Sequence, residues 1–279
     1  MLLTLLLAGS LANGPSVDEI LEKAIAVQRL HEEAGNEVKY DYEILNVSEK
    51  LDKHGDVKEV EEQLFESSHI NNVAYERLVE KNGKALTEKE LKREAKRERD
   101  FREKLEKGDA QRNDDEDNVV FDEELIERYD FALDDVRDVS GRRTYILSYK
   151  PKPGKLPEKK RMDRIINKTR GSLWVDAETF QITQVEFELT ERVKLWWGVL
   201  GSISKMKGTF KRHPVSDEIW LPERAVFYVK GRVLFRSLHV RENIFWSDFA
   251  KRPHLRQGSG GQEPKIAASP SSESSEKPR

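Results

Sequence analysis

Few residues of this 279-residue chain have types and spacings that suggest catalysis or metal binding. No cysteine is present, which excludes disulfides, thiolate metal sites and thiol nucleophiles. The six histidines are scattered, and no two have the four-residue spacing of a helical metal site: His31, His54, His69, His213, His239 and His254. No glycine-rich phosphate loop or nucleophile-elbow motif occurs. We expect a non-enzymatic protein without a metal or cofactor; catalysis by an unrecognised carboxylate pair is the alternative.

Aromatic side chains recur at alternate positions of several predicted strands. Alternate residues of a strand point to the same face of a sheet, so these rings would converge in the interior if the sheet curls. The set comprises Tyr40, Tyr42, Tyr145, Tyr149, Phe187, Phe227 and Phe235. We predict that they line a cavity for a lipidic acyl chain, held by burial of apolar surface. An ordinary, filled barrel core is the alternative.

Two adjacent tryptophans, Trp196 and Trp197, lie between Lys194 and Lys205. Adjacent residues of a strand point to opposite faces, so one ring would stand outside a one-sided sheet. Indole rings favour the boundary between membrane and water. We predict a membrane contact or a flap over the cavity mouth; packing of both rings beneath a helix is the alternative.

Charge is abundant but balanced, with 49 Lys and Arg against 52 Asp and Glu. The net charge of -3 lacks the strong basic field that nucleic-acid binding usually needs. Of the 20 residues in 88–107, 16 are charged, and opposite charges recur three or four residues apart. This segment is typical of a solvated helix, and with the acidic residues that follow it we define a charged helical insertion at about 87–118.

The two ends of the chain differ in composition from the part between them. Residues 1–12 combine an apolar stretch with small residues, which predicts a secretory signal peptide and export, most simply to a periplasm. Residues 251–279 are rich in Gly, Ser, Pro, Glu and Lys, which predicts a disordered polar tail. Between them, 13–250 is expected to fold as one domain.

Period-two patterns dominate this domain and predict eight or nine antiparallel strands. Apolar residues at helical spacing predict a helix from Val17 to about Gly35, a short helix over 122–129 and a basic helix over 158–169. We therefore expect a mainly β (α+β) fold. Its antiparallel sheet would curl into a half-open barrel that uses helices as lids.

The segments 141–153 (GRRTYILSYKPKP) and 171–187 (GSLWVDAETFQITQVEF) resemble the LolA/LolB-type lipoprotein-sorting proteins of bacteria, which include outer membrane lipoprotein carriers. The resemblance covers most of 17–248. It implies a LolA-like half-barrel that encloses an apolar cavity for acyl chains. The charged insertion and the polar tail depart from this family, and the missing cysteine separates the chain from a lipid-anchored LolB form.

Together these features predict an exported, monomeric protein that binds and transfers a lipid or a lipoprotein acyl chain. A bacterial envelope interaction or sensor module with a filled core is the alternative.

Overall fold

The computed structural model describes residues 14–35, 39–71, 73–108, 119–195, 201–216, 219–234 and 236–252. The predicted signal peptide at 1–12 and nearly all of the predicted tail at 251–279 lie outside these residues. Among the residues described, no helix is both long and apolar enough to cross a membrane.

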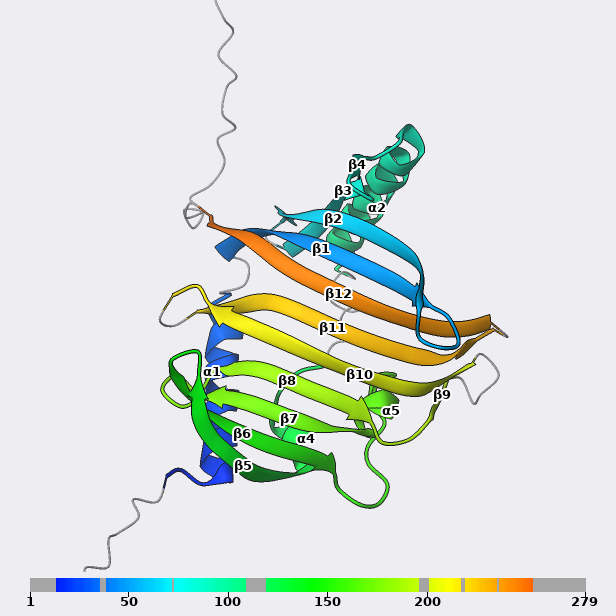
Figure 1. Cartoon of the computed structure of the whole chain (residues 1–279). Helices are drawn as coiled ribbons and strands as arrows, with labels where there is room; N and C mark the ends of the chain where they lie inside the picture. Colours follow the sequence, from blue (N-terminus) through cyan, green and yellow to red (C-terminus); the bar gives the residue numbers. More distant parts are fainter. Residues whose placement is uncertain are drawn as a thin grey trace, which may run out of the picture.

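The described residues form one antiparallel sheet of twelve strands, broad and twisted in Figure 1. Its strands are β1 (Tyr40–Leu51), β2 (Val57–Ile70), β3 (Val73–Lys81), β4 (Lys84–Ala85), β5 (Tyr129–Val139), β6 (Arg142–Pro151), β7 (Thr169–Asp176), β8 (Ile182–Leu189), β9 (Val193–Leu195), β10 (Gly201–Pro214), β11 (Trp220–Val233) and β12 (Arg236–Lys251). In space their order is β4-β3-β2-β1-β12-β11-β10-β8-β7-β6-β5, and β9 pairs with β10. The first and last long strands, β1 and β12, are therefore neighbours inside the sheet.

The sheet is open, because β4 and β5 each pair on one side only. The predicted mainly β, antiparallel class is confirmed. The prediction of eight or nine strands is wrong, since the described residues form twelve, and these strands form one open sheet, so the predicted curling into a half-open barrel is not confirmed. Strands β4 and β9 have only two and three residues, so they are too short to show a period-two pattern in the sequence.

Helix α1 (Val17–Glu33) crosses one face of the sheet, which we call the helix side (Figure 1). It begins at a capping box, in which Ser16 and Glu19 each accept a hydrogen bond from the other's backbone N–H. The helix and the sheet share one hydrophobic cluster, made of Ile20, Leu21, Ala24, Tyr145, Leu147, Leu173, Val175 and Ile182. The predicted N-terminal helix with one buried face is thus confirmed.

Helix α2 (Glu88–Glu106) is the predicted charged helix, and none of its residues is buried. It contacts β3 through Phe101, whose ring lies 5.1 Å from that of Tyr75, and through Glu94, which accepts a hydrogen bond from the Tyr75 hydroxyl at 2.7 Å. The helix therefore touches the sheet along a narrow stripe only, as its composition predicts.

Two short helices, α4 (Glu123–Glu127) and α5 (Asp163–Ile166), precede β5 and β7. The basic helix predicted over 158–169 is wrong in its extent. Its first residues instead form a turn, because the Asp163 carboxylate accepts hydrogen bonds from the backbone N–H groups of Lys159 and Lys160, at 2.6 and 2.8 Å.

Candidate functional site

A row of aromatic residues and glycines crosses the helix side of the sheet. Tyr149 and Gly171 lie on this side because each is two residues from a core residue of the same strand. Strand pairing then joins Tyr149 to Gly171, Gly171 to Phe187, Phe187 to Gly208, and Gly208 to Phe227. We call these five residues the aromatic row. Large rings and glycines alternate along it, over five neighbouring strands.

The glycines let the rings of the row lie close to the sheet. A Cβ atom on Gly208 would stand 2.5 Å from Cζ of Phe187 and 2.9 Å from Cδ1 of Phe227, so both rings lie over this glycine. Their centroids are 6.0 Å apart. At Gly171 a Cβ atom would collide with the backbone oxygen of Glu186. Glycine inside a strand often marks such a close approach.

Tyr149 is fixed at one end of the row. Its hydroxyl donates a hydrogen bond to the backbone oxygen of Glu186 at 3.0 Å, and its ring meets that of Tyr129 edge-on at 5.3 Å. Burial, with smaller contributions from Tyr129 and Glu186, raises the pKa of Tyr149 above its ordinary value. The phenol therefore stays neutral near pH 7 and acts as an apolar surface rather than as a nucleophile.

Further apolar side chains extend the row over β10, β11 and β12. On the same face lie the half-buried residues Met206, Phe210, Val229, Ile244 and Trp246. The rings of Phe210 and Trp246 meet edge-on at 6.1 Å. A groove of about 2050 Å³ lies mainly on the opposite face of the sheet, because most of its lining side chains, such as Lys207, Thr209 and Glu188, are one residue out of phase with the row. The helix side thus presents a partly accessible apolar surface, and the charged groove lies on the other face.

A carboxylate ends the row beyond Phe227. Glu242 is the partner of Phe227 on β12, and its Oε1 accepts a hydrogen bond from the Ser48 hydroxyl at 2.7 Å. Its Oε2 is buried and has no hydrogen-bond partner among the described residues, and the same is true of Oδ1 of Asn46. Asn46 and Ser48 are two positions apart on β1, so their side chains, and with them the two acceptors, lie on one face. Buried acceptors usually find a donor, so a ligand hydroxyl or ammonium would suit this position.

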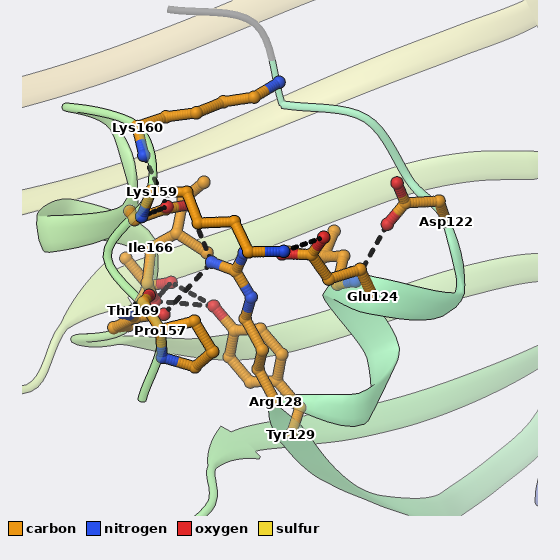
Figure 2. Close-up of polar contacts among 12 residues, drawn as sticks. Asp122, Glu124, Arg128, Tyr129, Pro157, Lys159, Lys160, Ile166 and Thr169 are labelled. Atoms are coloured by element: carbon orange, nitrogen blue, oxygen red, sulfur yellow. Dashed lines mark hydrogen bonds and ion pairs between the residues drawn. The ribbon is translucent and has the colours of Figure 1, made fainter. Parts of the chain in front are cut away.

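A buried polar network fastens α4 and α5 beside the Tyr149 end of the row (Figure 2). Arg128 donates hydrogen bonds to Asp163 at 2.6 Å and to Glu124 at 2.7 Å. The side chains of Arg128 and Asp163 are only 8% and 5% exposed. Tyr129, which contacts Tyr149, donates its hydroxyl proton to the backbone oxygen of Ile166 at 2.5 Å. The network therefore positions the short helices and the Tyr149 ring together.

A second buried ion pair holds the β7–β8 turn at the α1 end of the sheet. Arg142 donates through Nε and Nη2 to Asp176, at 2.6 and 2.9 Å. Asp176 also accepts hydrogen bonds from the backbone N–H and the hydroxyl of Thr179, and its side chain is 1% exposed. The next turn residue, Phe180, stacks on Tyr145 of the core. This pair thus links the turn to the surface on which α1 packs.

Both buried aspartates have lowered pKa values. Burial alone would raise the pKa of Asp163 and of Asp176, but hydrogen bonds from arginine, backbone N–H groups and, for Asp176, the Thr179 hydroxyl outweigh it. The ionised form of each is therefore favoured in the folded chain. Each carboxylate stabilises the fold above its unfolded-state pKa of about 3.9, and this stabilisation is lost as the pH falls through the lowered folded-state value.

We expect the stability advantage of the wild type over Asp176→Asn to shrink as the pH falls from about 6 to about 2. The asparagine cannot ionise, so only the wild type loses a favourable charge in this range. Urea unfolding of both proteins at a series of pH values measures the difference. An advantage that stays constant with pH would contradict the assignment.

The structure brings together some of the predicted site residues and separates others. Tyr149, Phe187 and Phe227 share the aromatic row. Tyr145 lies on the same face but is buried, in the cluster under α1. Tyr40 and Tyr42 lie at the far end of β1, where Tyr40 pairs with Lys251 and Tyr42 contacts Phe249, whereas the β1 residue in register with Phe227 is Ser48, through Glu242. Phe235, Trp196 and Trp197 lie outside the described residues.

Sequence reasoning missed the glycines of the row, Glu242 and the two buried ion pairs. Gly171 and Gly208 were detectable as glycines inside strand patterns. The partners Arg128 and Asp163 are 35 residues apart, and no local pattern joins them. Within the described ranges no group of three or more His, Asp or Glu side chains could hold a metal ion.

Comparison with known sequences finds no matching family model and no matching curated protein. Several solved structures are similar over most of the chain. One is a DUF1329 family protein from Desulfovibrio piger, with 14% identity, coverage of 88% of this chain and 96% of that chain, and a TM-score of 0.35. Another is a LolA superfamily protein from Nitrosomonas europaea, with 10% identity, coverage of 86% and 96%, and a TM-score of 0.31.

An outer membrane lipoprotein-sorting protein domain from Vibrio parahaemolyticus is also similar, with 11% identity, coverage of 85% of this chain and 95% of that chain, and a TM-score of 0.34. LolA-type proteins, which the sequence resembles, are thus among its structural neighbours.

Proposed function

We propose that this chain is an exported, non-enzymatic, monomeric protein that binds the acyl chain of a lipid or lipoprotein, and passes it on within a bacterial periplasm. The acyl chain would lie on the helix side, along the aromatic row. The observation that carries the proposal is the half-buried apolar surface of Phe187 and Phe227 over Gly208.

The chemistry of the row suits a hydrocarbon ligand. Burial of each ligand methylene contributes about 0.8 kcal/mol, so a long chain can bind without any polar contact. The one hydroxyl of the row, on Tyr149, is directed to a backbone oxygen and is not available for a reaction. At the other end, the unpartnered oxygen of Glu242 could accept a hydrogen bond from a polar group of the ligand.

A second candidate function is an envelope interaction or sensor module. It is favoured by the packing of α1, which fills the helix side over β6, β7 and β8 with a closed hydrophobic cluster. Under this alternative the residues of the row are an extension of that core. Ligand binding separates the two candidates, because a filled core would take up no acyl chain.

Replacing Gly208 by leucine is expected to weaken the binding of a fluorescent fatty acid at least about tenfold, because the new side chain would occupy the space over which both rings lie. Titration of the purified protein with the probe measures this effect, and native mass spectrometry of protein from its own host shows whether an acyl species co-purifies. Phe227→Ala, which removes ring surface without overpacking, is expected to weaken binding as well.

The matched control is Thr209→Leu, which adds a similar side chain to the next residue of β10, on the opposite face. It should leave probe binding unchanged. A wild-type protein that neither co-purifies with an acyl species nor binds the probe would overturn the proposal in favour of the filled-core module.

A further inference from the structure

The turn between β11 and β12 exposes apolar side chains. Val233 pairs with Arg236, which leaves a two-residue loop that begins at Leu234. Leu234 is 56% exposed and Val233 is 38% exposed. The backbone of Leu234 has a φ of 46°, in the left-handed region that is unfavourable for a bulky residue. Both its exposure and its backbone conformation thus disfavour leucine at this position.

Other two-residue turns of the sheet use the residues that such turns prefer. The loop between β3 and β4 is Asn82–Gly83, with φ values of 53° and 66°. The loop between β5 and β6 is Ser140–Gly141, with φ values of 55° and 83°. Asparagine and glycine tolerate positive φ, which the tight hairpin requires. Formation of the turn therefore does not explain the leucine at position 234.

Packing does not explain Leu234 either. Most non-glycine residues with positive φ in the described chain are polar: Asn71, Asn82, Ser140 and Asp248. The remaining two are Phe180 and Leu234. Phe180 stacks on Tyr145, and Nζ of Lys23 lies 4.6 Å from its ring centre. Leu234 is instead mostly exposed. A strained and exposed apolar residue of this kind is a candidate for a contact outside the chain.

Positively charged residues flank this turn. Arg232 and Arg236 flank it, and both are exposed. On β10 and β11, Lys205 pairs directly with Lys230, an arrangement of like charges that is unfavourable in isolation. None of the four cations named here forms a salt bridge within the part of the chain that the structure describes.

We propose that the β11–β12 turn is a contact site for an anionic phospholipid bilayer. Leu234 and Val233 would enter the boundary between headgroups and acyl chains. Arg232, Arg236 and the Lys205–Lys230 pair would meet the lipid phosphates, since basic residues near an anionic surface bind it by charge attraction. The arrangement fits a bilayer surface, because the apolar side chains at the turn can reach the acyl chains while the cations beside them stay at the level of the anionic headgroups.

The test is co-sedimentation of the full chain with vesicles of phosphatidylcholine, with and without phosphatidylglycerol, at low salt. We expect binding to the anionic vesicles only, and release by added salt. Leu234→Asn should weaken binding about tenfold, because it removes the apolar tip. It should leave the melting temperature unchanged or higher, because asparagine tolerates the positive φ. A loss of binding by Leu234→Asn at an unchanged melting temperature therefore cannot be due to unfolding.

Arg232→Gln and Arg236→Gln should each weaken binding to the anionic vesicles about fivefold.

Leu91→Asn is the matched control, because Leu91 is 54% exposed but lies on α2, away from the turn. It should bind vesicles as the wild type does. Equal binding by the wild type and Leu234→Asn would overturn the proposal, as would a wild type that ignores anionic vesicles. The fatty-acid titration involves neither vesicles nor this turn, so the membrane contact and the acyl-binding function can fail independently.

Discussion

Asp176→Ala is expected to lower the free energy of unfolding by about 3–5 kcal/mol, the range for breaking a buried ion pair. Asp176 is 1% exposed, and its carboxylate accepts two hydrogen bonds from Arg142 and two from Thr179. Removing it leaves the partly buried guanidinium of Arg142 without its main partner. It also frees the β7–β8 turn, whose Phe180 packs on the core. Much of the loss should therefore come from the surface that holds α1.

Urea unfolding monitored by circular dichroism measures this change. Asp176→Asn should be less damaging than Asp176→Ala, because its side-chain oxygen can still accept from the turn. Glu188→Ala is the control, since Glu188 forms an exposed cross-strand pair with Arg170 and should contribute no more than about 1 kcal/mol. Equal effects of Asp176→Ala and Glu188→Ala would show that the buried pair does not stabilise the fold.

Arg128→Ala should also destabilise the chain by about 3–5 kcal/mol, since it leaves the buried carboxylate of Asp163 without its positively charged partner. The Asp163 carboxylate would keep its hydrogen bonds from the backbone of Lys159 and Lys160, but it would lose the positive charge beside it. The loss should spread to Tyr129 and Tyr149, because the same network positions both rings. We therefore expect weaker fatty-acid binding in addition to lower stability.

A double-mutant cycle of Arg128→Ala and Asp163→Ala, each measured by urea unfolding, tests the coupling. We expect the double variant to be less destabilised than the sum of the single variants, because no uncompensated charge remains between them. Lys159→Ala is the control: its ammonium pairs with Glu124 but is 66% exposed, so its loss should change stability by no more than about 1 kcal/mol. Additive single effects would argue against a coupled pair.

The sequence predicts local structure well where a local rule determines it. The capping box at Ser16 and the spacing of Ile20, Leu21 and Ala24 are sufficient to predict α1. Period-two alternation correctly assigns the facing of Tyr145 and Tyr149. Helix α5 was overpredicted because helical spacing takes no account of the Asp163 carboxylate, which bonds the preceding backbone.

The site was only partly predictable, because alternation gives the face of a residue but not its partner on the next strand. Tyr149, Phe187 and Phe227 align only through the register of five strands. Tyr42 has the same pattern in the sequence, but its strand β1 pairs with β12, which comes from the opposite end of the chain. Register of this kind depends on long-range pairing, which a single sequence does not show.

The open edges of the sheet bear on how the chain behaves at high concentration. The outer side of β5 presents unpaired backbone groups, a usual starting point for fibrillar aggregation. This strand, however, carries four aspartates, Asp130, Asp134, Asp135 and Asp138, and its pairing is interrupted between Leu133 and Asp135. A second β5 would meet this edge with like charges and a mismatched bend. At the other edge, β4 has only two residues and pairs with the end of β3, and α2 packs against Tyr75 of β3. We therefore expect the open sheet not to polymerise through its two edges.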